Sequence, residues 1–225
     1  MAIELKKGQT VDLTKKHAGL DKITIGLSWG SNVQQVSAET EPKQKKGFLA
    51  RLFDKATGGT SPSNPPHSSI VDDMDIDSSV VMVDTRGSLY DKIYYGNRKS
   101  SCRSIVHAGD DLTGKNKQGN YDNEEIEINL KTIPSDVEKL VFLANIYNGE
   151  YYKQHFGQVG GAYIRVLQSS NREELIRYDL ADEYDGMRGL VVGELYRYQG
   201  EWKFRAIGQA TKNDSLSNLI SKVAR

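Results

Sequence analysis

Short segments in which polar and apolar residues alternate recur along most of the 225-residue chain, and they constrain its fold more than any other feature. Alternation with a period of two places every second side chain on the same face of a β-strand. Residues 125–130, EIEINL, show this clearly, because three aliphatic side chains face one way and three polar ones the other. Four such segments follow in rapid succession between residues 161 and 208, which predicts an antiparallel meander. Their sequences are GAYIRVLQ, ELIRYDL, GLVVGELYRY and EWKFRAIG.

Two further segments indicate a sheet that is covered on its outer side. Residues 139–147, KLVFLANIY, are almost wholly apolar, so we expect a central strand that is buried on both faces. Near the C-terminus, apolar residues recur at helical spacing after a capping residue, Asp214 or Ser215. The sequence therefore predicts an all-β protein, an antiparallel β-sandwich with a C-terminal amphipathic helix lying on the sheet. The apolar residues of that helix are Leu216, Leu219, Ile220 and Val223.

Residues 32–69 interrupt the strand pattern. This segment is rich in Gln, Lys, Ser, Thr, Gly and Pro and ends in TGGTSPSNPPHSS, so we expect a flexible insertion within one domain that spans 1–225. Within it, residues 43–55 combine four apolar side chains at helical spacing with several basic ones. Such a helix could contact an anionic membrane or dock on a partner protein. Alternatively, it could be a linker that aids solubility or packs against its own domain.

Composition and charge limit the partners and the cellular compartment that we expect for the protein. Thirty basic residues balance thirty acidic ones, so the net charge gives no reason to expect nucleic acid as a partner. The single cysteine, Cys102, cannot form an internal disulfide. No apolar run resembles a signal peptide or is long enough to span a membrane. We therefore expect a cytoplasmic protein.

Residues 107–130 concentrate acidic side chains on a glycine-interrupted stretch that runs into the EIEINL segment. Calcium binds about six to eight oxygens, so its sites need several carboxylates and backbone carbonyls on a chain that can bend around the ion. Gly109, Gly114 and Gly119 supply that freedom. The stretch is therefore a candidate calcium site, and the alternative is an acidic hairpin loop that faces solvent.

A second acidic group precedes this stretch. Asp73, Asp75 and Asp77 recur with a period of two and would lie on one face of a strand, where their charges repel. Their spacing resembles the start of an EF-hand loop, but Ser78 and Asp84 stand where the turn glycine and the bidentate glutamate belong. We therefore reject an EF-hand and expect a strand that brings its carboxylates to the other acidic stretch around a shared cation.

A catalytic interpretation would use His107 beside Asp110, with Cys102 or Ser104 as the nucleophile. The sequence contains no nucleophile elbow, phosphate-binding loop or zinc-type spacing of His and Cys residues. We therefore expect that the protein is not an enzyme.

Taken in order, several motifs resemble the TerD family of tellurium-resistance and stress-response proteins, which are calcium-binding β-sandwiches. The motifs are GLDKITIGLSW, DMDIDSS, HAGDDLTG followed by DNEEIEINL, IPSDVEKLVFLANIY, FGQVGGAYIRV, ELIRYDL and GELYRYQGEWKFRAIGQ. They cover nearly everything outside 32–69 and 85–103. The resemblance implies that six carboxylates and two backbone oxygens hold calcium. The implied ligands are the side chains of Asp75, Asp77, Asp110, Asp111, Asp122 and Glu124, with backbone oxygens near Leu112 and Gly114.

Three positions depart from the family pattern. Gly30 follows the tryptophan where members often carry aspartate, and Asn120 and Asn123 stand in a run that members often have as GDGDDE. Fewer carboxylates lower the charge of the site, so we expect weakened affinity or the loss of one of two calcium positions.

The resemblance also implies a function. It indicates a non-enzymatic calcium-binding scaffold or sensor in resistance to tellurite or chemical stress, working with the protein partners of a stress-resistance complex. Such a protein would be cytoplasmic or peripheral at the inner face of the membrane. The alternative is a module that docks on a membrane or partner through residues 43–55, with calcium serving only a structural role.

Overall fold

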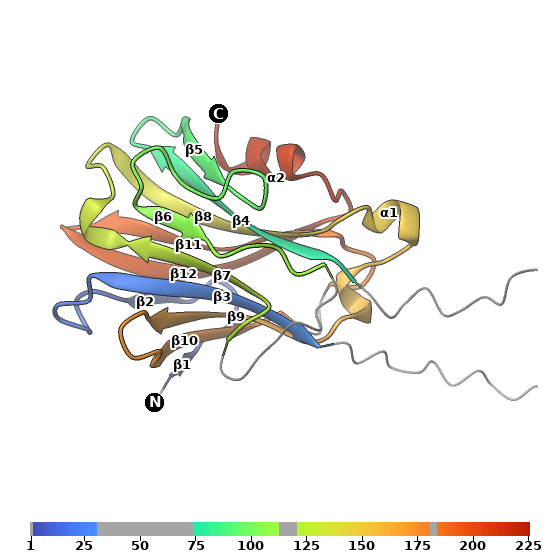
Figure 1. The fold of residues 1–225 in the computed structure, drawn as a ribbon, viewed down its shortest axis with the longest axis horizontal. Helices are drawn as coiled ribbons and strands as arrows, with labels where there is room; N and C mark the ends of the chain where they lie inside the picture. Colours follow the sequence, from blue (N-terminus) through green and yellow to red (C-terminus); the bar gives the residue numbers. More distant parts are fainter. Residues whose placement is uncertain (1, 31–73, 113–120, 181–183) are drawn as a thin grey trace, which may run out of the picture.

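The computed structural model describes residues 2–30, 74–112, 121–180 and 184–225, which form two β-sheets packed face to face (Figure 1). The strands are β1 (Ile3–Glu4), β2 (Thr10–Asp12), β3 (Lys22–Gly30), β4 (Ile76–Asp84), β5 (Leu89–Ile93), β6 (Ile105–His107), β7 (Glu124–Asn129), β8 (Val137–Ile146), β9 (Gly160–Gln168), β10 (Glu174–Asp179), β11 (Gly189–Tyr198) and β12 (Glu201–Thr211). The helices are η2 (Leu130–Thr132), α1 (Gly149–Tyr152), η3 (Phe156–Gln158) and α2 (Leu216–Val223).

The order of the strands confirms the expected antiparallel β-sandwich. Sheet A has the order β1-β10-β9-β3-β7-β6, and sheet B has the order β2-β12-β11-β8-β4-β5. Neighbouring strands are antiparallel except β1 and β10, which pair in parallel at one edge of sheet A. The single-domain prediction over 1–225 stays a prediction, since residues 32–69 lie outside the described residues.

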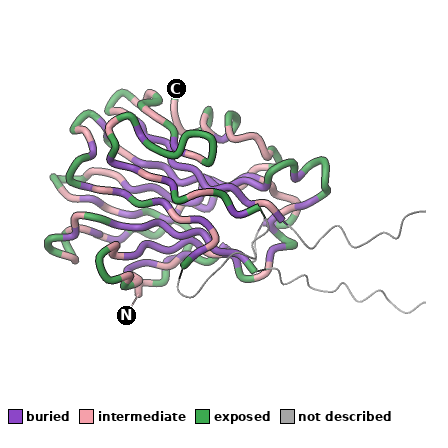
Figure 2. The backbone as a smooth tube through the Cα atoms, in the orientation of Figure 1, coloured by how far each residue is buried: buried purple, intermediate pink, exposed green. Residues whose placement is uncertain are grey.

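The apolar core lies between the two sheets, where the buried backbone segments concentrate (Figure 2). The alternating strands supply it as expected: Ile25 of β3 and Ile126 of β7 are buried and directly opposite each other in sheet A. From sheet B, Phe142 and Phe204 stack with ring centroids 6.1 Å apart. Burial of such side chains is the main favourable term in folding, at about 25 cal/mol per Å² of apolar surface.

A second apolar cluster lies on the outer face of sheet B, beneath α2. There Leu219 is fully buried against Val81 and Val83 of β4 and Val141 and Leu143 of β8. This confirms the amphipathic C-terminal helix, and it explains the apolar run at 139–147, because β8 is covered by the core on one face and by α2 on the other.

The expected meander of four consecutive strands is wrong. β9 and β10 form a hairpin in sheet A, whereas β11 and β12 form a hairpin in sheet B. Alternation determines which face of a strand is buried, but both sheets of a sandwich present the same pattern, so it does not determine to which sheet a hairpin belongs.

Strand β5 occupies Leu89–Ile93, within the 85–103 stretch that the family motifs do not cover, and pairs with β4. In addition, β4 begins at Ile76, so Asp75 precedes the strand that was expected to carry it, and Asp73 lies outside the described residues.

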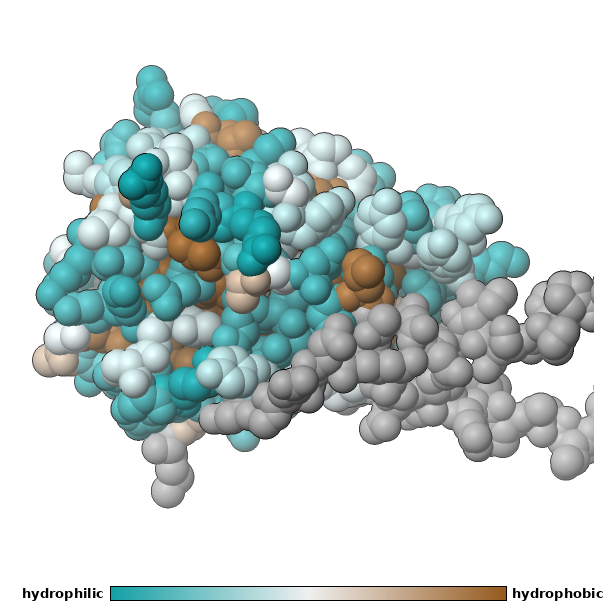
Figure 3. Space-filling view, in the orientation of Figure 1, coloured by the Kyte–Doolittle hydropathy of each residue, from teal (hydrophilic) through white to brown (hydrophobic). Residues whose placement is uncertain are grey.

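The surface seen in Figure 3 is mostly hydrophilic, and its hydrophobic spots are small and separate. Among the described residues, none of the helices combines the length and apolar character that crossing a membrane requires.

The packing of α2 predicts the cost of truncating its central side chain. Leu219→Ala should lower the free energy of unfolding by about 2–5 kcal/mol, because it leaves a cavity between the helix and sheet B. Urea unfolding followed by circular dichroism measures this loss. Asn218→Ala, at an exposed position of the same helix, is the control and should change little. An equal, small effect of both substitutions would show that α2 contributes little to stability.

Candidate metal centre

Three carboxylates from two distant segments meet at one end of the sandwich. One oxygen each from Asp75, Asp77 and Asp110 can be chosen so that all three atoms lie within 4.8 Å of one another. Asp77 belongs to β4, Asp75 immediately precedes that strand, and Asp110 lies in the loop after β6. The expectation that the two acidic stretches converge is therefore confirmed for these three residues.

Backbone hydrogen bonds hold both segments in place. The Tyr147 N–H donates to the Asp75 carbonyl at 2.9 Å, which extends the pairing of β4 with β8 to that residue. On the loop, the Ala108 N–H donates to the Glu125 carbonyl at 2.8 Å, and Arg98 donates from its guanidinium to the carbonyls of His107 and Ala108. The carboxylates are thus positioned by sheet-like bonds on both sides.

Beneath the cluster, Glu124 and His107 connect the two sheets. Glu124 of β7 accepts a 2.6 Å hydrogen bond through Oε2 from the Ser78 N–H of β4. The His107 ring accepts at Nδ1 from the Gly109 N–H, at 3.1 Å, which assigns the ring proton to Nε2. That nitrogen lies 3.3 Å from the Ser78 carbonyl and 3.6 Å from Glu124 Oε2.

Burial, and after it the repulsion between neighbouring carboxylates, disfavours the charged forms of Asp75, Asp77 and Asp110. Burial raises the pKa of Asp75 to about 6, and the charges of Asp110 and Glu124 add to the effect. Burial, followed by the nearby Asp75, raises the pKa of Asp77 to about 8. The pKa of Asp110 is also raised, first by burial and then by Glu124. A cation held between these groups would offset that repulsion.

Buried oxygens without hydrogen-bond partners mark the same place. Asp75 Oδ1 and Glu124 Oε1 are both buried and have no hydrogen-bond partner among the described residues. A buried polar atom that lacks a partner costs about 1–3 kcal/mol. Such oxygens, facing a cluster that consists only of carboxylates, fit a hard cation such as calcium.

The remaining predicted ligands have other surroundings. Asp111 is buried, and its Oδ2 accepts a 2.9 Å hydrogen bond from the Asn123 amide. Asp122 accepts a 2.8 Å bond from the Arg165 guanidinium. Leu112 is exposed, and Gly114 lies outside the described residues. Of the implied set, the structure brings Asp75, Asp77 and Asp110 together, with Glu124 directly behind them.

Two asparagines have roles that the sequence did not indicate. Asn145 of β8 donates from its amide to Asp77 Oδ2 at 3.1 Å, and its polar side chain at the end of an apolar strand was the available signal. Asn123 accepts hydrogen bonds from Ser28 Oγ and the Trp29 N–H, at 3.1 and 3.0 Å, so it fastens its loop to β3.

The residues of the catalytic interpretation contact other groups. The ring of His107 is fully buried against Ser78, Gly109 and Glu124. Ser104 donates its hydroxyl to the Thr132 carbonyl at 2.6 Å.

Comparison with known proteins agrees with the motifs. The sequence model of a family described as TerD domain matches residues 1–222. Stress response protein SCP2 of Bacillus subtilis is 40% identical over 99% of both chains. Tellurium resistance protein TerD of Serratia marcescens is 32% identical over 93% of this chain and 91% of its own length.

Solved structures support the fold. A protein of unknown function, SAV2460, has a TM-score of 0.62 at 17% identity, over 92% of this chain and 99% of its own. A homologue of telluride resistance protein (TerD), SCO6318 from Streptomyces coelicolor A3(2), has a TM-score of 0.55 at 17% identity, over 88% and 95%. Both are similar to this chain in their β-rich fold.

The raised pKa of Asp77 predicts how stability depends on pH when no divalent cation is present. Because its pKa is about 8 in the folded chain against an ordinary 3.8, the folded state binds the proton more tightly than the unfolded state. The stabilisation of the folded state by protonation of Asp77 is fully present below about pH 4 and is lost as the pH rises through about 8. Asp77→Asn removes the free-energy cost of the charged, buried Asp77 carboxylate, so at about pH 9 in EDTA it should stabilise the protein by roughly 1–3 kcal/mol.

Thermal unfolding of the wild type and the variant between about pH 5 and pH 9 measures this difference. Asp136→Asn, in an exposed turn, is the matched control and should follow the wild type. Parallel curves for wild type and Asp77→Asn would show that Asp77 carries no charge penalty in the fold.

Proposed function

Because the chain belongs to the TerD family, whose members include tellurium-resistance and stress-response proteins, we propose that it is a calcium-binding, non-enzymatic scaffold or sensor in resistance to tellurite or chemical stress. The relatives are named as resistance and stress proteins. The proposal places the protein in the cytoplasm, where it would work with protein partners of a stress-resistance complex.

One observation carries the calcium proposal: Asp75, Asp77 and Asp110 converge from two segments that are far apart in the sequence. Like charges that converge in a folded protein raise its free energy unless a cation neutralises them. The family relationship and the partnerless oxygens of Asp75 and Glu124 support the same conclusion independently.

The chemistry of the donors favours calcium over other divalent ions. Carboxylates select hard ions such as calcium, magnesium and manganese, whereas zinc prefers sulfur and nitrogen donors. Magnesium requires a near-octahedral arrangement, whereas calcium accepts the irregular geometry that a strand and a loop provide. Asp75, Asp77 and Asp110 would hold the ion, with Glu124 available from the β7 side.

Calcium bound in this way would act on the arrangement of the loop after β6. The loop supplies Asp110, whereas β4 and the residue before it supply Asp77 and Asp75. An ion between them ties a loop that follows sheet A to a strand of sheet B. A change in calcium concentration would therefore alter how firmly this end of the sandwich is ordered, which is the property that a sensor or a calcium-stabilised scaffold needs.

The second candidate function, docking on a membrane or partner through residues 43–55, stays a prediction from the sequence, since this segment lies outside the described residues. Deletion of 43–55 should abolish binding to vesicles that contain anionic lipid, because it removes the basic residues that a negative surface attracts. Co-sedimentation of the full chain and the deletion variant measures this. Equal sedimentation of the two proteins would exclude the segment as a membrane anchor.

The calcium proposal predicts the effect of removing single ligands. Calorimetric titration of the EDTA-treated chain should show calcium binding that excess magnesium does not abolish. Asp77→Asn and Asp110→Asn should each weaken it on the order of tenfold or more, because even groups that only support a metal ligand often contribute that much. An unchanged titration of either variant would refute the site.

Asp122→Asn provides a contrast within the predicted ligand set. Asp122 is paired with Arg165, so its substitution should lower stability, by roughly 1–3 kcal/mol, while calcium affinity stays within a few-fold of the wild type. A tenfold loss of affinity in this variant would instead place Asp122 among the ligands.

A further inference from the structure

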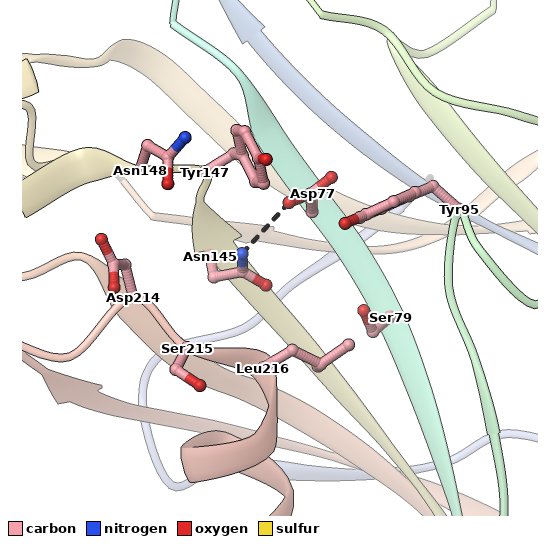
Figure 4. A pocket seen from close by; sticks show the side chains of 9 residues that line it. All are labelled: Asp77, Ser79, Tyr95, Asn145, Tyr147, Asn148, Asp214, Ser215 and Leu216. Carbon is pink, nitrogen blue, oxygen red and sulfur yellow. Dashed lines mark hydrogen bonds between the residues drawn. The ribbon is translucent and has the colours of Figure 1, made fainter. Parts of the chain in front are cut away.

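A cavity of about 270 Å³ opens beside the acidic cluster, on the outer face of sheet B where α2 begins (Figure 4). Strands β4 and β8 form its floor, and the start of α2 and the segments after β5 and β8 form its walls. The residues that line it are Asp77, Ser79, Tyr95, Asn145, Tyr147, Asn148, Asp214, Ser215 and Leu216.

The cavity arises from a change of character along one sheet face. Alternation along β4 places Asp77 and Ser79 on the same face as Val81, and Asn145 of β8 lies opposite Asp77. Helix α2 covers the apolar part of this face but begins only at Leu216. The polar end of the face is therefore left beside the helix as the floor of the cavity.

Two buried polar atoms on that floor have no hydrogen-bond partner within the part of the chain that the structure describes. They are Ser79 Oγ and Asn145 Oδ1, on residues that are 2% and 5% exposed. One N–H of the Asn145 amide donates to Asp77, and the Asn145 Oδ1 atom, which lacks a partner, can accept but not donate. A ligand with hydrogen-bond donors would satisfy Asn145 Oδ1, and the Ser79 hydroxyl can accept from it as well.

The charges around the cavity favour a positive ligand. Its described lining contains the carboxylates of Asp77 and Asp214 and no lysine or arginine. Figure 4 shows Asp77 between Tyr95 and Tyr147, with Asp214 on the opposite side of the cavity. An anion would meet the carboxylate of Asp214, and no basic side chain of the described lining would compensate for that repulsion, so an anion is disfavoured.

We propose that this cavity binds the ammonium group of an alkylamine, either a free amine or the side chain of a lysine on a partner protein. An ammonium group carries three N–H donors and no acceptor, which suits a floor where Asn145 Oδ1 and Ser79 Oγ can both accept a hydrogen bond. The cavity is far larger than the space between ligands that a metal ion occupies, at about 2.3–2.6 Å per bond. It is also smaller than typical pockets for drug-sized molecules, so it suits one short chain.

The alkyl part of the ligand has an apolar wall to contact. Leu216 and the rings of Tyr95 and Tyr147 line the cavity, and both tyrosines are partly exposed at its mouth. Methylene groups next to the ammonium can pack there while the charged end reaches the floor.

This site is separate from the calcium site, although the two share Asp77. The inference rests on Ser79, Asn145 and Asp214, none of which belongs to the carboxylate cluster. Titration in EDTA tests the cavity alone, so failure of ammonium binding and failure of calcium binding are distinct results.

The test is an amide-resolved NMR titration of the full chain in EDTA with three probes: n-butylammonium, putrescine, and the lysine mimic Nα-acetyl-lysine methylamide. Saturable binding should shift the Ser79 amide and the Asn145 side-chain amide signals, whereas acetate at equal concentration should not. Stronger binding of the lysine mimic than of putrescine would indicate a protein side chain as the natural ligand, and the reverse order would indicate a free amine.

Two variants probe the floor and the wall of the cavity. Ser79→Ala removes the partnerless hydroxyl and should weaken ammonium binding about tenfold without loss of stability. Asp214→Asn, at a partly exposed position, should weaken it roughly two- to fivefold. The controls are Ser104→Ala, a buried serine bonded to Thr132, and Asp136→Asn; both should bind as the wild type does.

Several results would overturn the proposal. These are the absence of saturable binding by all three ammonium probes, unchanged affinity in both Ser79→Ala and Asp214→Asn, or acetate-induced shifts at the same signals. If calcium in the absence of EDTA shifts the Ser79 and Asn145 signals and Ser79→Ala abolishes that response, the cavity is a metal site and not an ammonium site.

Discussion

The hydrogen bond between Glu124 and the Ser78 N–H is the contact on which the end of the sandwich with the acidic cluster depends. It joins β7 of sheet A to β4 of sheet B inside the sandwich, at 2.6 Å and away from solvent. The His107 ring contacts both residues and accepts a hydrogen bond from the Gly109 N–H, in the loop that carries Asp110. Because charge-assisted hydrogen bonds in a low-dielectric interior are strong, this small junction adds to the backbone bonds that bring the two acidic segments together.

The fold keeps Asp75, Asp77 and Asp110 close together although their negative charges repel one another. Burial and neighbouring carboxylates raise the pKa values of Asp75, Asp77 and Asp110, so the folded chain without a cation keeps these groups at a cost in free energy. The packing of β8 between the core and α2 offsets that cost, since it anchors Asn145 and hence Asp77. A stable scaffold can therefore tolerate a local arrangement that is unfavourable by itself.

Much of this arrangement follows from the sequence, but the pairings do not. Period-two alternation in residues 125–130 was sufficient to place the aliphatic residues of β7 in the core, and the spacing of Leu216, Leu219 and Val223 was sufficient to predict α2. The concentration of acidic residues identified both acidic segments, and the family motifs implied the set of ligands. No local pattern, however, indicates that Asp122 pairs with Arg165, because that contact depends on the register of β3 with β9.

In that register, Gly26 lies opposite Arg165, and a Cβ atom at Gly26 would lie 1.9 Å from Asp122 Oδ2. A glycine in the middle of a strand thus makes room for a carboxylate from another loop. Sequence alone shows only an unexplained glycine there. The same limit applies to the two hairpins assigned to one meander, since their residues alternate equally well in either sheet.

The position of α2 connects the two polar sites of the molecule. The outer face of sheet B is apolar where α2 covers it. Near the point where the helix begins, the face becomes polar at Ser79, Asp77 and Asn145. Asp77 consequently faces the acidic cluster on one side and the cavity on the other. Any cation bound at one site changes the charge that the other site meets at Asp77, so the two sites must be thermodynamically coupled, and the coupling must be reciprocal.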